Sequence, residues 1–534
     1  MSPSQPEAET AENSRLLVMQ AAGLVGAAVL LSRVIGLVRE IVTRNYLGVI
    51  QLEATAYEIA RGFPEAIFLI IAGGAIGSAF IPTFAAYFVH DDEAGAWRLF
   101  SAVVNLVTLA VTVVAGLTIL LAPQFVSFIF GEKIAAEPAL LPLTVRLMRI
   151  MLLSPIIFGV SGVIMGALNA RQHFLLPALA PSIYNLGIIA GAILTPAEIG
   201  KEMGLAIGTV AGALGHLLIQ LPGLRQKQAH YTAVITLRDP GVQKVLRLMA
   251  PRVLGLSFSE INKFVVFFLT DTMALGTLPA LNTALRVIIM PQGVLGQALG
   301  IAAFPTLATL AARSAFGQMR RILTDALRLL LFLGLPATIL LITLRRPIIV
   351  ILFERGLTSA EDTALVANAL LFYAVGLVAL TALEVVARTF YALSDTVTPV
   401  LSGGVQVLLM AVLSLWLRDA VFPLFGWRQL GALALAFSVS NFLEVGLLLW
   451  LLRRKLGGLN GRDLFDGLWR MVVATLLMAA AIWIVLDILA TAGLLWQAMA
   501  ATVVGGVTYV LASLLLRVAE VRGFITFARR LKRD

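Results

Sequence analysis

Two arginines and a glutamate lie in a long apolar stretch near the N-terminus. The segment "SRVIGLVRE", residues 32–40, follows the run "LLVMQAAGLVGAAVLL" and places Arg33, Arg39 and Glu40 beside aliphatic side chains. A charged side chain costs at least about 2.5–3.5 kcal/mol at the centre of a membrane, so it is expected to face a water-filled cavity or a partner. A guanidinium group donates paired hydrogen bonds to two oxygens, which suits phosphate or diphosphate. These residues therefore define a candidate anion-binding site, in which Glu40 is expected to hold the Arg39 side chain.

Other ionisable residues extend this candidate site. Counting about 1.5 Å per residue along the expected helices places Arg33, Arg61, Lys263 and Arg286 in the same half of the membrane. Arg286 is the most distinctive, because apolar residues flank it in "ALRVIIMP". For Arg33, Arg39, Arg61 and Lys263, snorkelling toward the headgroups is the alternative interpretation. The predicted substrate-binding residues are Ser32, Arg33, Arg39, Glu40, Arg61, Arg252 and Arg286, accompanied by the acidic residues Glu58, Glu65 and Glu260.

The composition shows what must hold these residues in place. Hydrophobic residues make up 59% of the 534, charged residues make up 13%, and the mean hydropathy is +0.94. A soluble domain contains roughly 25% charged residues. Apolar stretches of about 20 residues recur along the chain, each long enough to cross a membrane as a helix. The sequence therefore predicts an all-α polytopic membrane protein.

The apolar stretches predict about fourteen membrane-spanning helices. The first is expected to be retained, because no basic segment precedes it and no cleavage site follows it. Most Lys and Arg residues between the spans fall on the side of the N-terminus, which predicts cytoplasmic termini. The expected spans are 16–38, 57–88, 99–121, 144–168, 174–195, 203–222, 245–270, 279–311, 327–352, 364–390, 397–418, 429–452, 469–490 and 493–517.

An internal repeat organises these helices. "RVIGL" at 33–37 returns as "RVLGL" at 252–256, and "AIGSAFIPTF" at 75–84 returns as "ALGIAAFPTL" at 298–307. An even number of helices in each copy gives both copies one orientation, which predicts a pseudo-two-fold axis along the membrane normal. The predicted parts are a polar cytoplasmic N-terminus (1–15), a six-helix lobe (16–222), a basic cytoplasmic linker (223–244), a second six-helix lobe (245–455), two further helices (456–517) and a basic cytoplasmic tail (518–534).

Prolines and glycines mark places where the spans bend or pack closely. Proline in a helix interior removes a backbone hydrogen bond and kinks the helix, which favours either a hinge or a static bend. Small residues at 72–77 favour close helix packing. The candidate hinge or packing residues are Gly36, Pro64, Pro82, Pro291 and Pro305.

Several functions are disfavoured by what the sequence lacks. It contains no phosphate-binding loop of the type G-x-x-x-x-G-K-[ST], so transport would draw on an ion gradient, the membrane potential or the substrate gradient. The four histidines form no metal-spaced pair, and no nucleophile and base pair is apparent, so we expect no enzyme activity and no cofactor. The chain has no cysteine. Its net charge of +10 is explained by membrane topology, so no nucleic-acid partner is expected.

Five segments resemble one known family. "SRVIGLVRE", "GGAIGSAFIPTFAAYF", "PQGVLGQALGIAAFPTLA", "LFERGLTSAEDT" and "FYALSDTVTPV" are similar to the MurJ (MviN-like) lipid II flippases of the multidrug/oligosaccharidyl-lipid/polysaccharide exporter superfamily. The resemblance implies two six-helix lobes around a cationic cavity and two extra helices that form a groove for the lipid tail. It implies alternating access without ATP in a bacterial inner membrane, with lipid II, membrane lipids and cell-wall synthesis enzymes as partners.

The same resemblance assigns residues and shows departures. The family's first-helix motif falls on Ser32, Arg33, Gly36, Arg39 and Glu40, and its helix-8 arginine falls on Arg286. The resemblance implies that the arginines among these residues bind the diphosphate or contribute to gating. Positions that are acidic or basic in many relatives are Thr55, Phe68, Leu69 and Gly73 here, which changes the expected headgroup contacts.

The expected function is therefore lipid II transport to the outer leaflet for peptidoglycan and cell-wall biogenesis. The alternatives are export of another lipid-linked oligosaccharide or of small molecules, and a non-transporting scaffold for cell-wall enzymes. The driving ion and any cation site are left open by the sequence.

Overall fold

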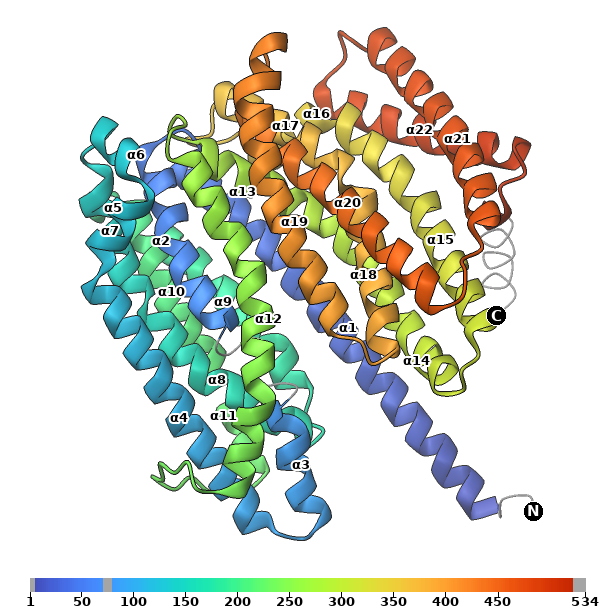
Figure 1. Cartoon of the computed structure of the whole chain (residues 1–534). Coiled ribbons are helices and arrows are strands. Elements are labelled where there is room, and N and C mark those ends of the chain that lie inside the picture. Colours follow the sequence, from blue (N-terminus) through green and yellow to red (C-terminus); the bar gives the residue numbers. More distant parts are fainter. Residues whose placement is uncertain (1–4, 71–78, 522–534) are drawn as a thin grey trace. The chain divides into compact units, whose positions relative to one another are not determined.

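The computed structural model describes the backbone of residues 5–70 and 79–521, and their side chains apart from residues 5–25 and several residues between 251 and 259. Helices and short connecting segments make up this described part, and no strand occurs in it (Figure 1). The predicted all-α class is confirmed.

Contacts divide the chain into two compact units, Met1–Gly276 and Thr277–Asp534. The first contains α1 (Gln5–Leu47), α2 (Leu52–Phe68), α3 (Ile81–Val89), α4 (Glu93–Leu120), α5 (Ala122–Ile129), α6 (Gly131–Ala136), α7 (Leu140–Met151), α8 (Leu153–Ala170), α9 (Leu175–Leu194), α10 (Lys201–Leu218), α11 (Leu221–Gln226) and α12 (Pro240–Thr270). The second contains α13 (Thr277–Gln292), α14 (Ala298–Ala312), α15 (Phe316–Thr343), α16 (Arg345–Phe353), α17 (Ala360–Val375), α18 (Leu377–Ala392), α19 (Val397–Trp416), α20 (Leu430–Lys455), α21 (Gly461–Ile488) and α22 (Leu494–Leu515). The helix α12 packs in the first unit, whereas the sequence places residues 245–270 in the second lobe.

Many of these helices can cross a membrane. Within the described residues, ten helical segments are long and apolar enough, or eleven if α17 and α18, which meet at 46°, form one bent span. The other three predicted spans correspond to α1, to α2 with α3, and to α12. The chain is a multi-pass membrane protein.

The helix α1 is longer than predicted. The predicted span ends at residue 38, but α1 continues to Leu47, so Arg39 and Glu40 lie on the helix and not beyond its end. Thr43 Oγ1 donates a hydrogen bond to the Arg39 carbonyl at 2.9 Å. Gly48 then ends the helix with a φ of 64°, a value that glycine adopts without strain.

The prolines take three different positions. Pro64 and Pro305 lie inside α2 and α14, and Pro82 begins α3. Pro291 lies at the end of α13, directly before a π-helical turn at Gly293–Gln297. Their role as hinges stays a prediction, and the small residues at 72–77 lie outside the described residues.

The helices α9 and α10 touch through their backbones. A Cβ added to Gly191 would lie 2.3 Å from the Gly204 carbonyl oxygen, and one added to Gly187 would lie 2.3 Å from the Gly212 Cα. Gly204, Gly208 and Gly212 follow at every fourth residue and form the stripe on α10 that permits this approach, as in small-residue packing of membrane helices. The two helices therefore form one tightly packed pair.

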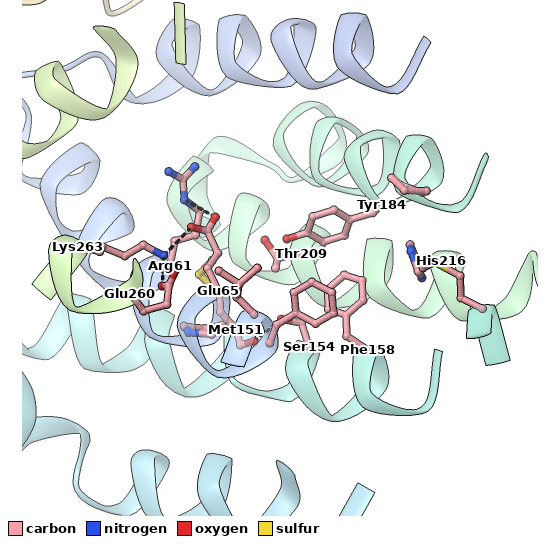
Figure 2. A pocket seen from close by; sticks show the side chains of 15 residues that line it. Arg61, Glu65, Met151, Ser154, Phe158, Tyr184, Thr209, His216, Glu260 and Lys263 are labelled. Carbon is pink, nitrogen blue, oxygen red and sulfur yellow. Dashed lines mark hydrogen bonds and ion pairs between the residues drawn. The ribbon is translucent and has the colours of Figure 1, made fainter. Parts of the chain in front are cut away.

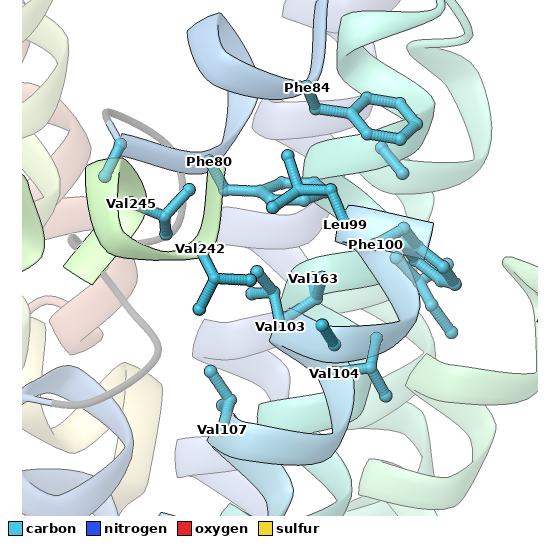
Figure 3. Packing of buried hydrophobic residues seen from close by; sticks show 14 of the residues in the cluster. Phe80, Phe84, Leu99, Phe100, Val103, Val104, Val107, Val163, Val242 and Val245 are labelled. Carbon is cyan, nitrogen blue, oxygen red and sulfur yellow. The ribbon is translucent and has the colours of Figure 1, made fainter. Parts of the chain in front are cut away.

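An aromatic and aliphatic core packs α3, α4, α8 and α12 of the first unit together (Figure 3). Phe80 and Phe84 of the α3 region stack at 5.0 Å and pack against α4. Residues of α8 and α12, including Val163 and Val242, complete this core. Van der Waals contacts between these closely packed side chains stabilise the unit.

The last two helices pack on α15 in the second unit. Met471, Met478 and Ile482 of α21 are buried with residues of α22. Tyr509 of α22 donates a hydrogen bond to the Phe332 carbonyl of α15 at 2.7 Å. The predicted lipid-tail groove on these helices stays a prediction.

A buried lysine connects α6 to the end of α12 within the first unit. The Lys133 ammonium donates to the Met273 carbonyl, and the Asp271 carboxylate accepts from the Lys133 backbone N–H at 2.9 Å. Burial lowers the pKa of the Lys133 ammonium to about 8, although Asp271 acts to raise it.

We predict that Gly191→Ala destabilises the α9–α10 pair. The added methyl group meets backbone that cannot rotate away, which should cost about 1–3 kcal/mol. Unfolding of detergent-solubilised protein measures this change. The control is Gly446→Ala in α20, where an added Cβ meets nothing within 4 Å. Equal stability of the two variants would contradict the prediction.

We also predict that Lys133 makes stability depend on pH. Because its folded pKa of about 8 lies below the ordinary value of 10.5, the unfolded chain binds more protons between these pH values. The free energy of unfolding should therefore rise with pH across this window. Unfolding measured at several pH values should show that Lys133→Met removes this part of the rise. The same slope in both proteins would exclude a contribution from Lys133.

Candidate functional site

A chain of buried charges joins the end of α1 to α2. Glu40 Oε1 lies 3.0 Å from Arg44 Nε, and Arg44 Nη2 pairs with Glu58 Oε1. Glu58 Oε2 in turn lies 2.6 Å from Arg61 Nη2. All four residues are at most 4% exposed. Two guanidinium groups and two carboxylates balance each other, as burial requires, since an unpaired buried charge costs several kcal/mol.

Helical spacing and one tight turn assemble this chain of charges. Glu40 and Arg44 are four residues apart on α1, and Glu58 and Arg61 are three apart on α2, so each pair shares a helix face. The turn at Gly48 reverses the chain between them, and Arg44 Nη1 donates to the Gly48 carbonyl at 3.3 Å. Arg44 therefore fixes both the turn and the pairing of the two helices.

Arg61, at one end of this chain of charges, borders a cavity of about 400 Å³ in the first unit (Figure 2). Its volume is typical of ligand-binding cavities. The walls come from α2, α7, α8, α9, α10 and α12. Beside four charged residues, the lining is aromatic, aliphatic or neutral and polar: Pro64, Phe68, Leu69, Met151, Ser154, Phe158, Met165, Pro181, Tyr184, Thr209 and His216.

The four charged residues of the lining form ion pairs with one another. Glu65 Oε1 lies 3.1 Å from Arg61 Nε, and Glu65 Oε2 lies 3.7 Å from Lys263 Nζ. Lys263 Nζ also lies 2.8 Å from Glu260 Oε2. The resemblance implies a cationic cavity, but the charges that line this one are balanced.

Glu40 and Arg39 each have a partner that the sequence did not indicate. Glu40 Oε1 accepts a hydrogen bond at 3.0 Å from Nε of Arg44, which lies one helical turn further along the same face. The expected hold of Glu40 on Arg39 stays a prediction. Arg39 Nη1 donates a hydrogen bond to Asn185 Oδ1 of α9 at 3.0 Å. The Arg39 side chain is thus oriented by a neutral amide.

The other predicted site residues lie in different places. Ser32 and Arg33 are partly exposed on α1, and a Cβ added to Gly36 would lie 3.7 Å from Asn185 Nδ2, an ordinary contact. Arg286 is partly exposed on α13 of the second unit. The side chain of Arg252 lies outside the described residues.

The sequence missed Arg44 and Asn185. The predicted first span ends at residue 38, which placed Arg44 in a loop and hid its pairing with Glu40. The spacing of four residues between Glu40 and Arg44 is the sequence signal that could have indicated this ion pair. No local pattern indicates Asn185, whose partner lies on a distant helix.

A neutral polar cluster lies at the wall formed by α8 and α10. Ser161 Oγ lies 2.7 Å from His216 Nδ1, and Gln220 Nε2 donates to Ser161 Oγ at 2.7 Å. His216 also packs edge-on against Phe158, with ring centroids 5.1 Å apart. The cluster holds the imidazole in a fixed orientation at the cavity wall.

The second unit has a cavity of its own, of about 520 Å³. Gln292 Nε2 donates to Glu384 Oε1 at 3.1 Å, and Glu384 Oε2 lies 3.3 Å from Arg388 Nη2.

The chain ranges that the structure describes contain no group of three or more His, Cys, Asp or Glu side chains that could hold a metal ion.

Superposition on solved structures defines the class of fold. An inward-facing structure of a multidrug resistance MATE family transporter of the MOP superfamily superposes with a TM-score of 0.69 at 14% identity, covering 82% of this chain and 98% of that one. A structure of a lipid II flippase MurJ in an inward closed conformation superposes with a TM-score of 0.75 at 23% identity, covering 92% of this chain and 99% of that one. The chain has the fold of the MOP transporter superfamily.

Sequence similarity then defines the family. The family model for lipid II flippase MurJ matches residues 16–504. A probable lipid II flippase MurJ of Vibrio cholerae is 30% identical over 486 residues, covering 89% of this chain and 88% of the relative. A lipid II flippase MurJ of Burkholderia cenocepacia is 29% identical, covering 81% of this chain and 83% of the relative. The chain belongs to the MurJ lipid II flippase family.

We predict that Glu58→Gln strongly destabilises the first unit. The substitution leaves Arg44 and Arg61 buried without their shared carboxylate, which should cost about 3–5 kcal/mol. Glu65→Gln is the matched control on the same helix, and it should cost no more than about 1 kcal/mol because its side chain is 40% exposed. Unfolding in detergent compares the two. Equal losses would show that Glu58 has no special structural role.

Proposed function

We propose that this chain is a lipid II flippase, which moves the undecaprenyl-diphosphate-linked peptidoglycan precursor from the inner to the outer leaflet. Membership of the family supports this function, because the chain covers most of the length of the relatives that carry the name. The multi-pass helical fold supports it as well.

The observation that carries the proposal is the charged cavity of the first unit. Crossing a bilayer requires the diphosphate to exchange its water for other hydrogen-bond donors, because an ion is costly in hydrocarbon. Arg61 and Lys263 line a cavity of about 400 Å³ beside aromatic and neutral polar groups. This combination suits a headgroup that is anionic in one part and carbohydrate in another.

The arginines of the sequence motif are the proposed further contacts. Arg39 is oriented by Asn185, and Arg286 lies in an otherwise apolar stretch of α13. We propose that Arg33, Arg39 and Arg286 each donate to the diphosphate during its crossing. Ser32, Glu40 and Arg252 are further residues that we propose to contribute to substrate binding.

The energy source and orientation complete the proposal. Transport proceeds by alternating access without ATP hydrolysis, since the sequence contains no phosphate-binding loop, and a coupling cation or the membrane potential drives it. The protein lies in the bacterial inner membrane with both termini in the cytoplasm, as the distribution of Lys and Arg favours. It acts as a transporter without catalysis, and cell-wall synthesis enzymes are its proposed protein partners.

We predict that Arg39→Ala and Arg286→Ala each abolish transport while insertion and folding are kept. Arg→Lys at either position should restore it only in part, because lysine lacks the planar fork that binds two oxygens. The assay supplies the chain to cells depleted of their own lipid II flippase and measures exposure of lipid II on the outer leaflet. Arg313→Ala is the control, since this arginine is exposed at the end of α14.

Normal flux in both alanine variants would refute the proposed arginine contacts. Failure of the well-inserted wild-type chain to restore exposure would refute lipid II as the cargo and leave another lipid-linked oligosaccharide in its place.

A further inference from the structure

Glu65 occupies a bridging position at the cavity of the first unit. Its two carboxylate oxygens face different cations: Oε1 lies 3.1 Å from Arg61 Nε, and Oε2 lies 3.7 Å from Lys263 Nζ. Arg61 belongs to α2 and Lys263 to α12, so this carboxylate connects the two helices (Figure 2). The Glu65 carboxylate, a group with two oxygens in one plane, thus lies between the two cations.

The contact with Arg61 is incomplete. Arg61 is 4% exposed, and within the described part of the chain no acceptor meets hydrogen-bond geometry for its Nε–H, although Glu65 lies at ion-pair distance. On its other side Arg61 Nη2 donates to Glu58 at 2.6 Å. The guanidinium is therefore held firmly by a buried carboxylate, while its Nε–H is poorly aligned with Glu65 at the cavity. A ligand oxygen in better alignment would form a stronger hydrogen bond with this N–H.

Glu65 differs from the other carboxylates in how tightly it is held. The Glu58 side chain is 0% exposed and is shared by two arginines, so its removal would leave buried cations. The Glu65 side chain is 40% exposed, and exposed ion pairs contribute little to stability. Lys263 lies closer to Glu260, at 2.8 Å, than to Glu65, at 3.7 Å. Glu65 is thus the most easily displaced member of the charge network.

We infer that Glu65 is an internal counter-ion that occupies the place of the substrate's anionic group and leaves Arg61 and Lys263 when that group binds. This inference rests on the proposed function. It adds one step, in which the Glu65 carboxylate leaves the two cations as the substrate's anionic group binds them. The ligand chemistry is an oxyanion, a phosphate or a carboxylate, whose oxygens accept from Arg61 Nε and Lys263 Nζ. Without such an anion the carboxylate keeps both cations neutralised at low cost in the membrane.

The exchange explains why the cavity carries balanced charges. An unneutralised pair of cations would bind an anion tightly and release it slowly, whereas displacement of an internal carboxylate weakens binding by the free energy of the lost ion pairs. Replacement of Glu65 by the anion also removes a protein link between α2 and α12. Anion binding is thereby coupled to the contact between these two helices.

The test is binding of inorganic pyrophosphate to the purified full chain in nanodiscs, measured by calorimetry. Glu65→Gln should bind it about tenfold more tightly than the wild type, which corresponds to about 1.4 kcal/mol, because no carboxylate must be displaced. Glu65→Asp keeps the charge but shortens the arm, so it should tighten binding less than Glu65→Gln does. Glu260→Gln is the matched control, since it removes one carboxylate from the same lining but leaves the Glu65 bridge intact.

The outcomes separate the inference from the proposed function. Equal affinities for the wild type and both Glu65 variants, or equal tightening by Glu65→Gln and Glu260→Gln, would overturn the inference. If neither the wild type nor any variant binds pyrophosphate, the inference is overturned for a phosphate ligand. A dipeptide with a free C-terminal carboxylate, tested in the same way, then shows whether the oxyanion is a carboxylate. Lipid II exposure with the wild-type chain in depleted cells decides the proposed function independently.

Discussion

The cost of burying ionised groups in a membrane protein determines how the first unit is built. Arg44 is fully buried and is held there by Glu40 on its own helix and by Glu58 on the next. Because Glu58 also binds Arg61, one carboxylate serves two guanidinium groups and couples the end of α1 to the middle of α2. The position of Arg61 at the cavity, and hence the geometry of the whole charged lining, depends on this shared carboxylate.

A second constraint acts through neutral groups. The amide of Asn185 orients Arg39, and its position follows from the packing of α9 against α1. On the opposite side of α9, glycines bring the backbone of α10 into direct contact. The polar cluster of Ser161, His216 and Gln220 then lies at the wall between α8 and α10. The cavity therefore combines walls held by backbone contact with walls held by ion pairs.

The sequence predicted most of the fold because the apolar stretches of a membrane protein are long and easily counted. Helix ends were predicted less well, since polar residues at a helix end and in a loop have similar composition. The end of α1 shows this clearly: the apolar pattern predicts a span that ends before Arg39, Glu40 and Arg44, although these residues continue the helix. The sequence named candidate site residues in the first helix but not the partners that these residues have in the structure. The pairing of Glu40 with Arg44 follows from the helix face that they share, and the contact of Arg39 with Asn185 follows from packing between distant segments.

The glycine contact between α9 and α10 has a consequence for how the cavity changes shape. Two helices whose backbones are in direct contact cannot slide or rotate past each other without separating. The helices α9 and α10 therefore move as one rigid pair, which carries Tyr184 and His216. The opposite side, where α2 meets α12, is joined at the cavity by the loose bridge through Glu65. A change in the shape of the cavity must therefore be concentrated at the α2–α12 side, while α9 and α10 keep their positions relative to each other.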